Sequence, residues 1–248
     1  FEIKSIAYRE IEKAHLYYNT PLVNDYNEIH KNQPFFYITN YLLNENVPSA
    51  EEQFNRYDAQ FIANGNAKDE RFYLWQAMIY KSEFDFNNAI ATYDTLLSEN
   101  PNSALAYFNK ANTMLDLLEL LLKLETGNGE FINAGDEYQA IELKDVETIN
   151  IRLKEIQKLY EKAIKIEPEF YLAWFNMAIV LGEQRDFNAS LEAYSKAIKI
   201  NEDFKEAYLN RGVNYLFLEN PKKACSDFSK AGELGLSEAY KIIKKYCK

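Results

Sequence analysis

The sequence has few of the residues that usually carry catalysis or bind metal ions. Its 248 residues include two histidines, His15 and His30, and two cysteines, Cys225 and Cys247. It contains no metalloprotease helix motif, no phosphate-binding loop and no hydrolase nucleophile turn. No histidine stands near a cysteine in the sequence to complete a zinc site. We therefore predict no catalytic residue, no metal site and no cofactor, and we expect a protein that is not an enzyme.

Positive charge is low and dispersed. The formal net charge is −10, and no basic run is longer than Lys244-Lys245. A nucleic-acid backbone requires concentrated lysine and arginine, so we expect no nucleic-acid partner. A basic peptide remains compatible with this charge.

Long apolar runs are missing as well. No run approaches the roughly 20 residues that span a bilayer, so we expect no transmembrane segment. No signal peptide is visible, and the chain begins with Phe1 and not with Met. We interpret it as the C-terminal part of a longer chain, or a processed form.

Glycine and proline are scarce, with eight and six residues, while 47% of the chain is hydrophobic. Disorder is therefore not expected over most of the chain. Residues 171–204 predict two amphipathic helices joined by a polar turn at 184–186, because apolar residues recur there at three- and four-residue steps. Such a short hairpin cannot bury both apolar faces alone, so we expect neighbours of the same kind.

The pattern recurs with a period of 34 residues. At this spacing Trp174 is followed by Tyr208, and Ala178 by Gly212. Earlier positions fit too: Tyr73, Ala77, Tyr80, Ala89, Tyr93, Tyr107, Ala111, Tyr160 and Ala163. Over 70–238 the chain resembles the tetratricopeptide repeat family, and in particular the bacterial arrays of that family.

This resemblance implies an all-α fold, a right-handed α-solenoid of helical hairpins. Four repeats are expected, at 70–103, 104–170, 171–204 and 205–238. Ser190 and Ile156 depart from the family pattern, because they stand where a small alanine is usual.

The second repeat is enlarged by an insertion at about 117–150. We expect both of its helices to be longer by about seven residues, with a loop between them. The leucines of the first long helix, from Leu117 to Leu124, are expected either to pack within the hairpin or to form a partner-binding spur.

The two ends of the array are expected to differ. Residues 1–69 predict an irregular, mostly helical N-terminal segment, with a degenerate hairpin at 35–65 that caps the first repeat. Residues 239–248 predict a C-terminal capping helix, whose apolar face covers the last repeat and whose other face is rich in lysine.

Cys225 and Cys247 flank the turn near Gly235 at nearly equal distances. If the last two helices are antiparallel, the two sulfurs lie at similar positions along the helix axes. One interpretation is a disulfide, which requires an oxidising compartment. The other is a pair of small buried thiols.

Three asparagines, Asn109, Asn176 and Asn210, each stand two residues after the bulky aromatic position of a first helix. Asparagine offers a donor and an acceptor, so such a ladder can hold an extended peptide backbone, and the resemblance implies this role in the concave groove. Alternatively, these asparagines bond to a neighbouring helix. The other side chains expected to face the groove are Phe108, Asn112, Phe175, Ile179, Leu209 and Val213.

Arrays that hold a carboxylate terminus use lysine or arginine beside such asparagines. Lys110 and Arg211 stand one residue away and are expected to face the packing side, so we predict no such ligand.

The leading functional prediction is a non-enzymatic scaffold that binds a protein or an extended peptide in the groove. The alternative is a structural or self-association segment of a longer repeat protein. The disulfide interpretation and the resemblance to exported bacterial repeat proteins favour the periplasm or the cell surface, and the cytoplasm is the alternative location.

Overall fold

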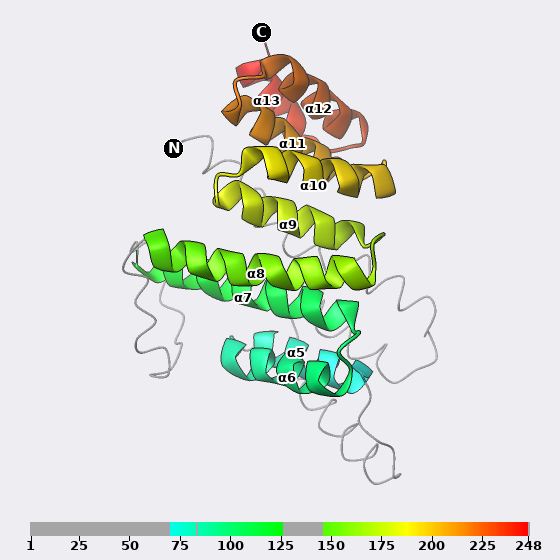
Figure 1. Cartoon of the computed structure of the whole chain (residues 1–248). Coiled ribbons are helices and arrows are strands. Elements are labelled where there is room, and N and C mark those ends of the chain that lie inside the picture. Colours follow the sequence, from blue (N-terminus) through cyan, green and yellow to red (C-terminus); the bar gives the residue numbers. More distant parts are fainter. Residues whose placement is uncertain (1–69, 83, 126–145, 248) are drawn as a thin grey trace. The chain divides into compact units, whose positions relative to one another are not determined.

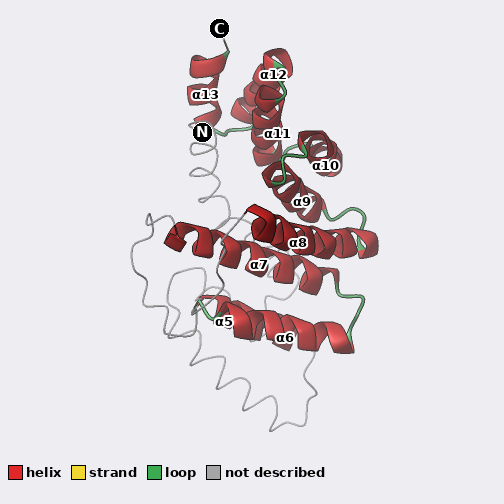
Figure 2. Cartoon of the chain, turned by 60° about the vertical axis from the view of Figure 1, so that its left-hand side comes forward, coloured by secondary structure: helices red, strands yellow, loops and turns green. Residues whose placement is uncertain are grey.

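The computed structural model describes residues 70–82, 84–125 and 146–247, and every regular element within these ranges is an α-helix (Figures 1 and 2). The prediction of an all-α fold, an α-solenoid of helical hairpins, is confirmed. The expected N-terminal segment at 1–69, its hairpin at 35–65 and the loop at 126–145 lie outside the described residues.

The chain divides into two compact units near Asn150, inside the enlarged second hairpin. We call them the α5–α7 unit and the α8–α13 unit and describe each separately. In the first, consecutive helices pack on one another: α5 (Glu70–Ser82), α6 (Phe86–Glu99) and α7 (Ala104–Glu125). Its core contains Phe72, Trp75 and Leu96.

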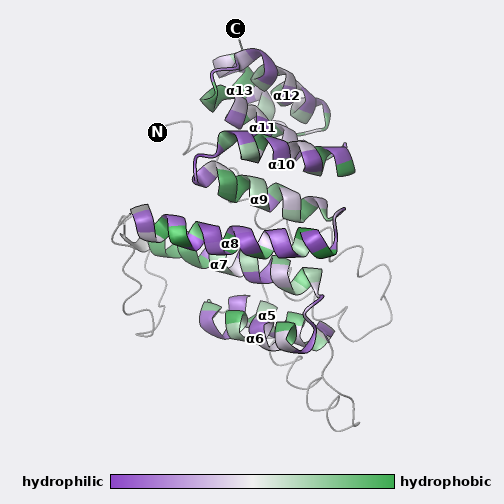
Figure 3. Cartoon of the chain, in the orientation of Figure 1, coloured by the Kyte–Doolittle hydropathy of each residue, from purple (hydrophilic) through white to green (hydrophobic). Residues whose placement is uncertain are grey.

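In the α8–α13 unit, the helices from α9 to α13 again pack in chain order. In Figure 3, α9 is mostly hydrophobic, whereas the visible face of α8 is mostly hydrophilic. This difference follows from burial, because α9 lies between helices of two repeats. The helices are α8 (Val146–Ile166), α9 (Tyr171–Glu183), α10 (Phe187–Ile200), α11 (Lys205–Phe217), α12 (Pro221–Glu233) and α13 (Glu238–Tyr246).

The two helices of the second repeat are longer than those of the third. The helices α7 and α8 have 22 and 21 residues, whereas α9 and α10 have 13 and 14. Leu117, Leu118 and Leu121 of α7 are buried. Burial at these positions agrees with packing and gives no support to an exposed leucine spur.

The turns between the helices of a hairpin share one construction. Phe84, Arg185 and Glu219 adopt left-handed backbone conformations, with φ of 63°, 63° and 54°. The next residue in each turn caps the following helix, as Asp186 does by accepting a hydrogen bond from the Ala189 backbone N–H at 3.1 Å. Asp85 and Asn220 make the equivalent bonds. These caps satisfy backbone donors that the first turn of a helix leaves open.

Small residues allow the two helices of a hairpin to approach closely. A Cβ atom placed on Gly212 of α11 would lie 2.6 Å from Cε1 of Phe228 and 3.2 Å from the Ala224 carbonyl oxygen of α12. Phe228 is fully buried, so its ring has little room to move. Glycine at 212 is therefore required by this ring.

Ser190 departs from the usual alanine because its hydroxyl is used. It donates a hydrogen bond to the Ala178 carbonyl oxygen at 2.5 Å and accepts one from Asn214 Nδ2 at 2.6 Å. This buried polar chain joins α9, α10 and α11, and therefore connects the third repeat to the fourth.

The last helix, α13, packs on α12 and is tied to it covalently. Cys225 and Cys247 form a disulfide, with their Cα atoms 5.7 Å apart, so the structure holds no free thiol. Ala239 of α13 is fully buried, and Ile242 and Ile243 pack against the core around Phe228. One face of α13 thus covers the end of the array.

We expect Gly212→Ala to lower the free energy of unfolding by about 1–3 kcal/mol, because the added methyl group displaces the Phe228 ring or separates the helices. Chemical denaturation would measure this. The matched control is Gly182→Ala, where the new Cβ lies 3.6 Å from Ser190 Oγ, an ordinary contact. That variant should be neutral or more stable by up to about 1 kcal/mol, and equal losses for both variants would contradict the packing explanation.

We expect Arg185→Gly and Glu219→Gly each to raise the free energy of unfolding by about 0.5–1 kcal/mol. Relief of the left-handed conformation, which costs about 1–2 kcal/mol, exceeds the added flexibility of the unfolded chain. Both side chains are exposed, so few contacts are lost. Arg185→Ala removes the same side chain but keeps Cβ, and an equal gain in that variant would refute the explanation.

Candidate protein-binding face and the polar contacts beside it

The predicted groove residues lie on the first helices of the repeats. Asn176 and Asn210 occupy α9 and α11, which contact one another within the α8–α13 unit. Asn109 occupies α7 in the other unit. The structure therefore brings two of the three asparagines onto neighbouring helices.

The large apolar side chains beside these asparagines are core residues. Phe175 is fully buried, and its ring centroid lies 5.5 Å from that of Tyr194 and 4.7 Å from that of Phe204. Phe108 is also fully buried, and Leu209 and Val213 pack with Phe228. Where the sequence predicts groove-facing side chains, these residues hold helices together. Ile179 is buried as well.

The asparagines differ in their exposure. Asn176 and Asn210 are 1% and 4% exposed, Asn112 is buried, and Asn109 is half-buried. Asn210 Nδ2 makes no hydrogen bond to another described residue. A buried amide donor in this condition costs free energy that a hydrogen-bond partner would recover.

Tyr194 of α10 is buried beside Asn210. Burial raises the pKa of its hydroxyl, and the negative charge of Glu183 acts in the same direction. Side-chain hydrogen bonds with Asn210 and Ser190 act in the opposite direction and lower that pKa. The phenol therefore stays protonated and available as a hydrogen-bond donor at neutral pH.

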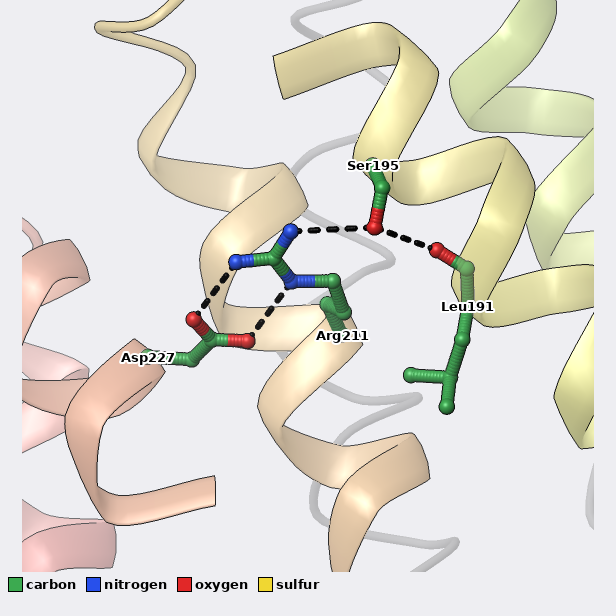
Figure 4. Close-up of polar contacts among 4 residues, drawn as sticks. All are labelled: Leu191, Ser195, Arg211 and Asp227. Carbon is green, nitrogen blue, oxygen red and sulfur yellow. Dashed lines mark hydrogen bonds and ion pairs between the residues drawn. The ribbon is translucent and has the colours of Figure 1, made fainter. Parts of the chain in front are cut away.

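The basic residues that follow two of the asparagines bind other helices. Arg211 of α11 donates two hydrogen bonds to the Asp227 carboxylate of α12, Nε to Oδ2 and Nη2 to Oδ1, both at 2.8 Å (Figure 4). It also donates to Ser195 Oγ of α10 at 3.0 Å, and Ser195 donates to the Leu191 carbonyl oxygen at 2.7 Å. One guanidinium thus joins three helices.

Lys110 makes the corresponding contact in the α5–α7 unit, where it forms an ion pair with Asp94 of α6. Asp94 stands 16 residues before Lys110, and Ser195 stands 16 before Arg211. As expected, both basic side chains face other helices. The sequence analysis missed their partners, although the common 16-residue spacing was the available signal.

The described part of the chain has no group of three or more metal-binding side chains arranged to hold an ion. None of the helices in that part is both long and apolar enough to cross a bilayer.

Two tetratricopeptide repeat models match the sequence, one over residues 171–204 and the other over 70–103. The chain therefore contains tetratricopeptide repeats. Proteins built from these repeats generally serve as non-catalytic scaffolds for protein interaction. No curated protein sequence matches this chain.

Solved structures of repeat proteins share the fold. The tetratricopeptide repeat protein TTC0263 from Thermus thermophilus superposes with a TM-score of 0.60 at 15% identity, over 86% of this chain and 95% of that one. MamA from Desulfovibrio magneticus RS-1 superposes with a TM-score of 0.56 at 15% identity, over 82% of this chain and 94% of that one. Human IFIT1, in a dimer with PPP-AAAA, superposes with a TM-score of 0.66 at 12% identity, over 90% of this chain and 48% of that one. At such identities the likeness shows the fold alone.

We expect Arg211→Ala and Asp227→Ala to be coupled by about 1–3 kcal/mol in a double-mutant cycle of unfolding free energies, because either single change leaves a largely buried charge without its partner. Their side chains are 18% and 9% exposed. The control pair is Arg152 and Glu155 of α8, at 44% and 46% exposure, where coupling should stay below about 0.5 kcal/mol. Similar coupling in both cycles would contradict a special role for Arg211.

Proposed function

We propose that the array binds an extended peptide segment of a partner protein along α9 and α11, with Asn176 and Asn210 holding its backbone. The tetratricopeptide repeats support a protein-interaction scaffold in general. The observation that carries the finer proposal is the buried Asn210 Nδ2, which has no acceptor among the described residues. A carbonyl oxygen of the peptide would supply that acceptor.

The chemistry favours a backbone ligand over a charged one. An amide side chain can donate to a peptide carbonyl and accept from a peptide N–H, which suits an extended segment of varied sequence. Arg211, the nearest basic group in sequence, is committed to Asp227 and Ser195. Recognition of a free carboxylate is therefore not part of the proposal.

The burial of Phe175, Leu209 and Val213 favours a second candidate, a segment that serves structure within a longer repeat protein. In that case the asparagines contribute to stability, and their removal would lower the free energy of unfolding without changing peptide affinity.

The double variant Asn176→Ala/Asn210→Ala separates the two. Peptides would be selected from a phage-displayed random library with the wild-type chain, and their affinities measured for both proteins. We expect the double variant to lose roughly tenfold or more in affinity. Its unfolding free energy should fall by less than that of Asn214→Ala, because Asn210 Nδ2 makes no hydrogen bond that the change would remove.

Asn214→Ala is the matched control, because this asparagine is also buried on α11 but donates to Ser190. It should lose stability, by about 1–3 kcal/mol, and keep its affinity for the peptides. Undiminished peptide binding by the double variant, or a loss of stability as large as that of Asn214→Ala, would reject the proposal and favour the structural candidate.

A further inference from the structure

The C-terminal end of the chain carries charge opposite to the rest. Residues 221–248 contain seven lysines and three carboxylates, which gives a formal charge of +4. Since the net charge of the chain is −10, the other residues together carry −14. One of the three carboxylates, Asp227, is already paired with Arg211. The carboxylates of this segment are therefore too few to balance its lysines.

The disulfide gathers this charge at one place. Lys222 and Lys223 precede Cys225 by three and two residues, and Lys244 and Lys245 precede Cys247 by the same intervals. Each pair lies within one helical turn of its cysteine, and the Cα atoms of the cysteines are 5.7 Å apart. All four side chains are exposed. We call these four residues the lysine-rich end.

Few carboxylates stand near these four lysines in the sequence. The first turn of α12 contains no acidic residue, although that end of a helix normally attracts one. Glu219, in the turn before α12, is the nearest carboxylate in the sequence. Two of the lysines lie near aromatic rings: Lys223 Nζ is 5.3 Å from the Tyr215 ring centroid, and Lys245 Nζ is 5.0 Å from that of Tyr246.

We propose that the lysine-rich end, assembled by the Cys225–Cys247 disulfide, is a second interaction surface that docks an acidic polypeptide segment. This surface is separate from the face of α9 and α11 and does not depend on peptide binding there.

Three features favour an acidic polypeptide over other polyanions. The cluster consists of lysines and contains no arginine, the residue that pairs best with phosphate. A chain of net charge −10 repels an extended membrane or nucleic acid, whereas a short acidic segment meets mainly the local charge. Finally, Ile242 and Ile243 of α13 pack inward and are not available to enter a bilayer.

The disulfide is expected to matter because it holds two like-charged helix ends together. A dithiol such as dithiothreitol reduces it: the S–S bond breaks, the two cysteines gain two electrons and two protons to become thiols, and the dithiol leaves as a cyclic disulfide. Repulsion between the two lysine pairs then favours separation of α13 from α12, which divides the surface.

The test measures binding of a short, fluorescent poly-L-glutamate peptide to the oxidised chain by anisotropy. The variant Lys222→Glu/Lys223→Glu/Lys244→Glu/Lys245→Glu should bind roughly tenfold or more weakly. The control reverses four exposed lysines of α8, Lys154, Lys158, Lys162 and Lys165, which stand among glutamates; it has the same net charge and should lose less than about threefold. A version with glutamine at 222, 223, 244 and 245 removes charge without adding repulsion and should also bind weakly.

Salt should weaken wild-type binding steeply, since the Debye length shrinks from about 10 Å at 0.1 M to about 3 Å at 1 M. Cys225→Ser/Cys247→Ser and the reduced wild type should both bind more weakly than the oxidised chain. The Asn176→Ala/Asn210→Ala variant should bind poly-L-glutamate normally, so failure of the peptide-groove proposal is distinguishable from failure of this one.

Equal losses in the two lysine variants would overturn the proposal, as would binding that does not change on reduction. Tighter binding to phosphatidylserine vesicles, or to single-stranded oligothymidine, than to poly-L-glutamate would also overturn it, and would identify a lipid or nucleic-acid surface instead.

Discussion

The structure depends on how closely two helices of a hairpin can approach. Where small residues face an aromatic ring, as Gly212 faces Phe228, the helix axes come near enough for the ring to be fully buried. The polar contacts between α10, α11 and α12 also require these helices to be close, because each hydrogen bond spans only a few ångströms. A repeat that packs in this way buries one face against its partner and the other against the next repeat, so no hairpin is stable alone.

Polar side chains then connect the repeats at defined points. Ser190 bonds to the Ala178 carbonyl oxygen and to Asn214, while Arg211 bonds to Ser195 and Asp227. Since buried polar groups are stable only when they are paired, they favour one arrangement of helices over others of similar apolar packing. Asn210 is unlike them, because its Nδ2 has no acceptor among the described residues, and this difference singles it out as a candidate for binding.

The two proposed surfaces differ in physical character. The face of α9 and α11 carries the buried amides of Asn176 and Asn210, whose chemistry suits a peptide backbone. The lysine-rich end is exposed and its affinity would come from charge, which suits an acidic segment and is sensitive to salt. A scaffold with two such surfaces could bind two partners at once, or one partner at two points, with the gain in affinity that linked contacts provide.

The sequence by itself determined the helices and their pairing. The 34-residue spacing of Trp174 and Tyr208, the long second hairpin and the closing helix are local or periodic features, and periodicity directly reports which face of a helix is buried. Only the tertiary structure decided which side chains are accessible and what they contact. It placed Phe108 and Phe175 in the core, gave Arg211 its partners 16 residues away on either side, and joined Cys225 to Cys247. These outcomes depend on the distance and rotation between neighbouring helices, which a repeat period does not specify.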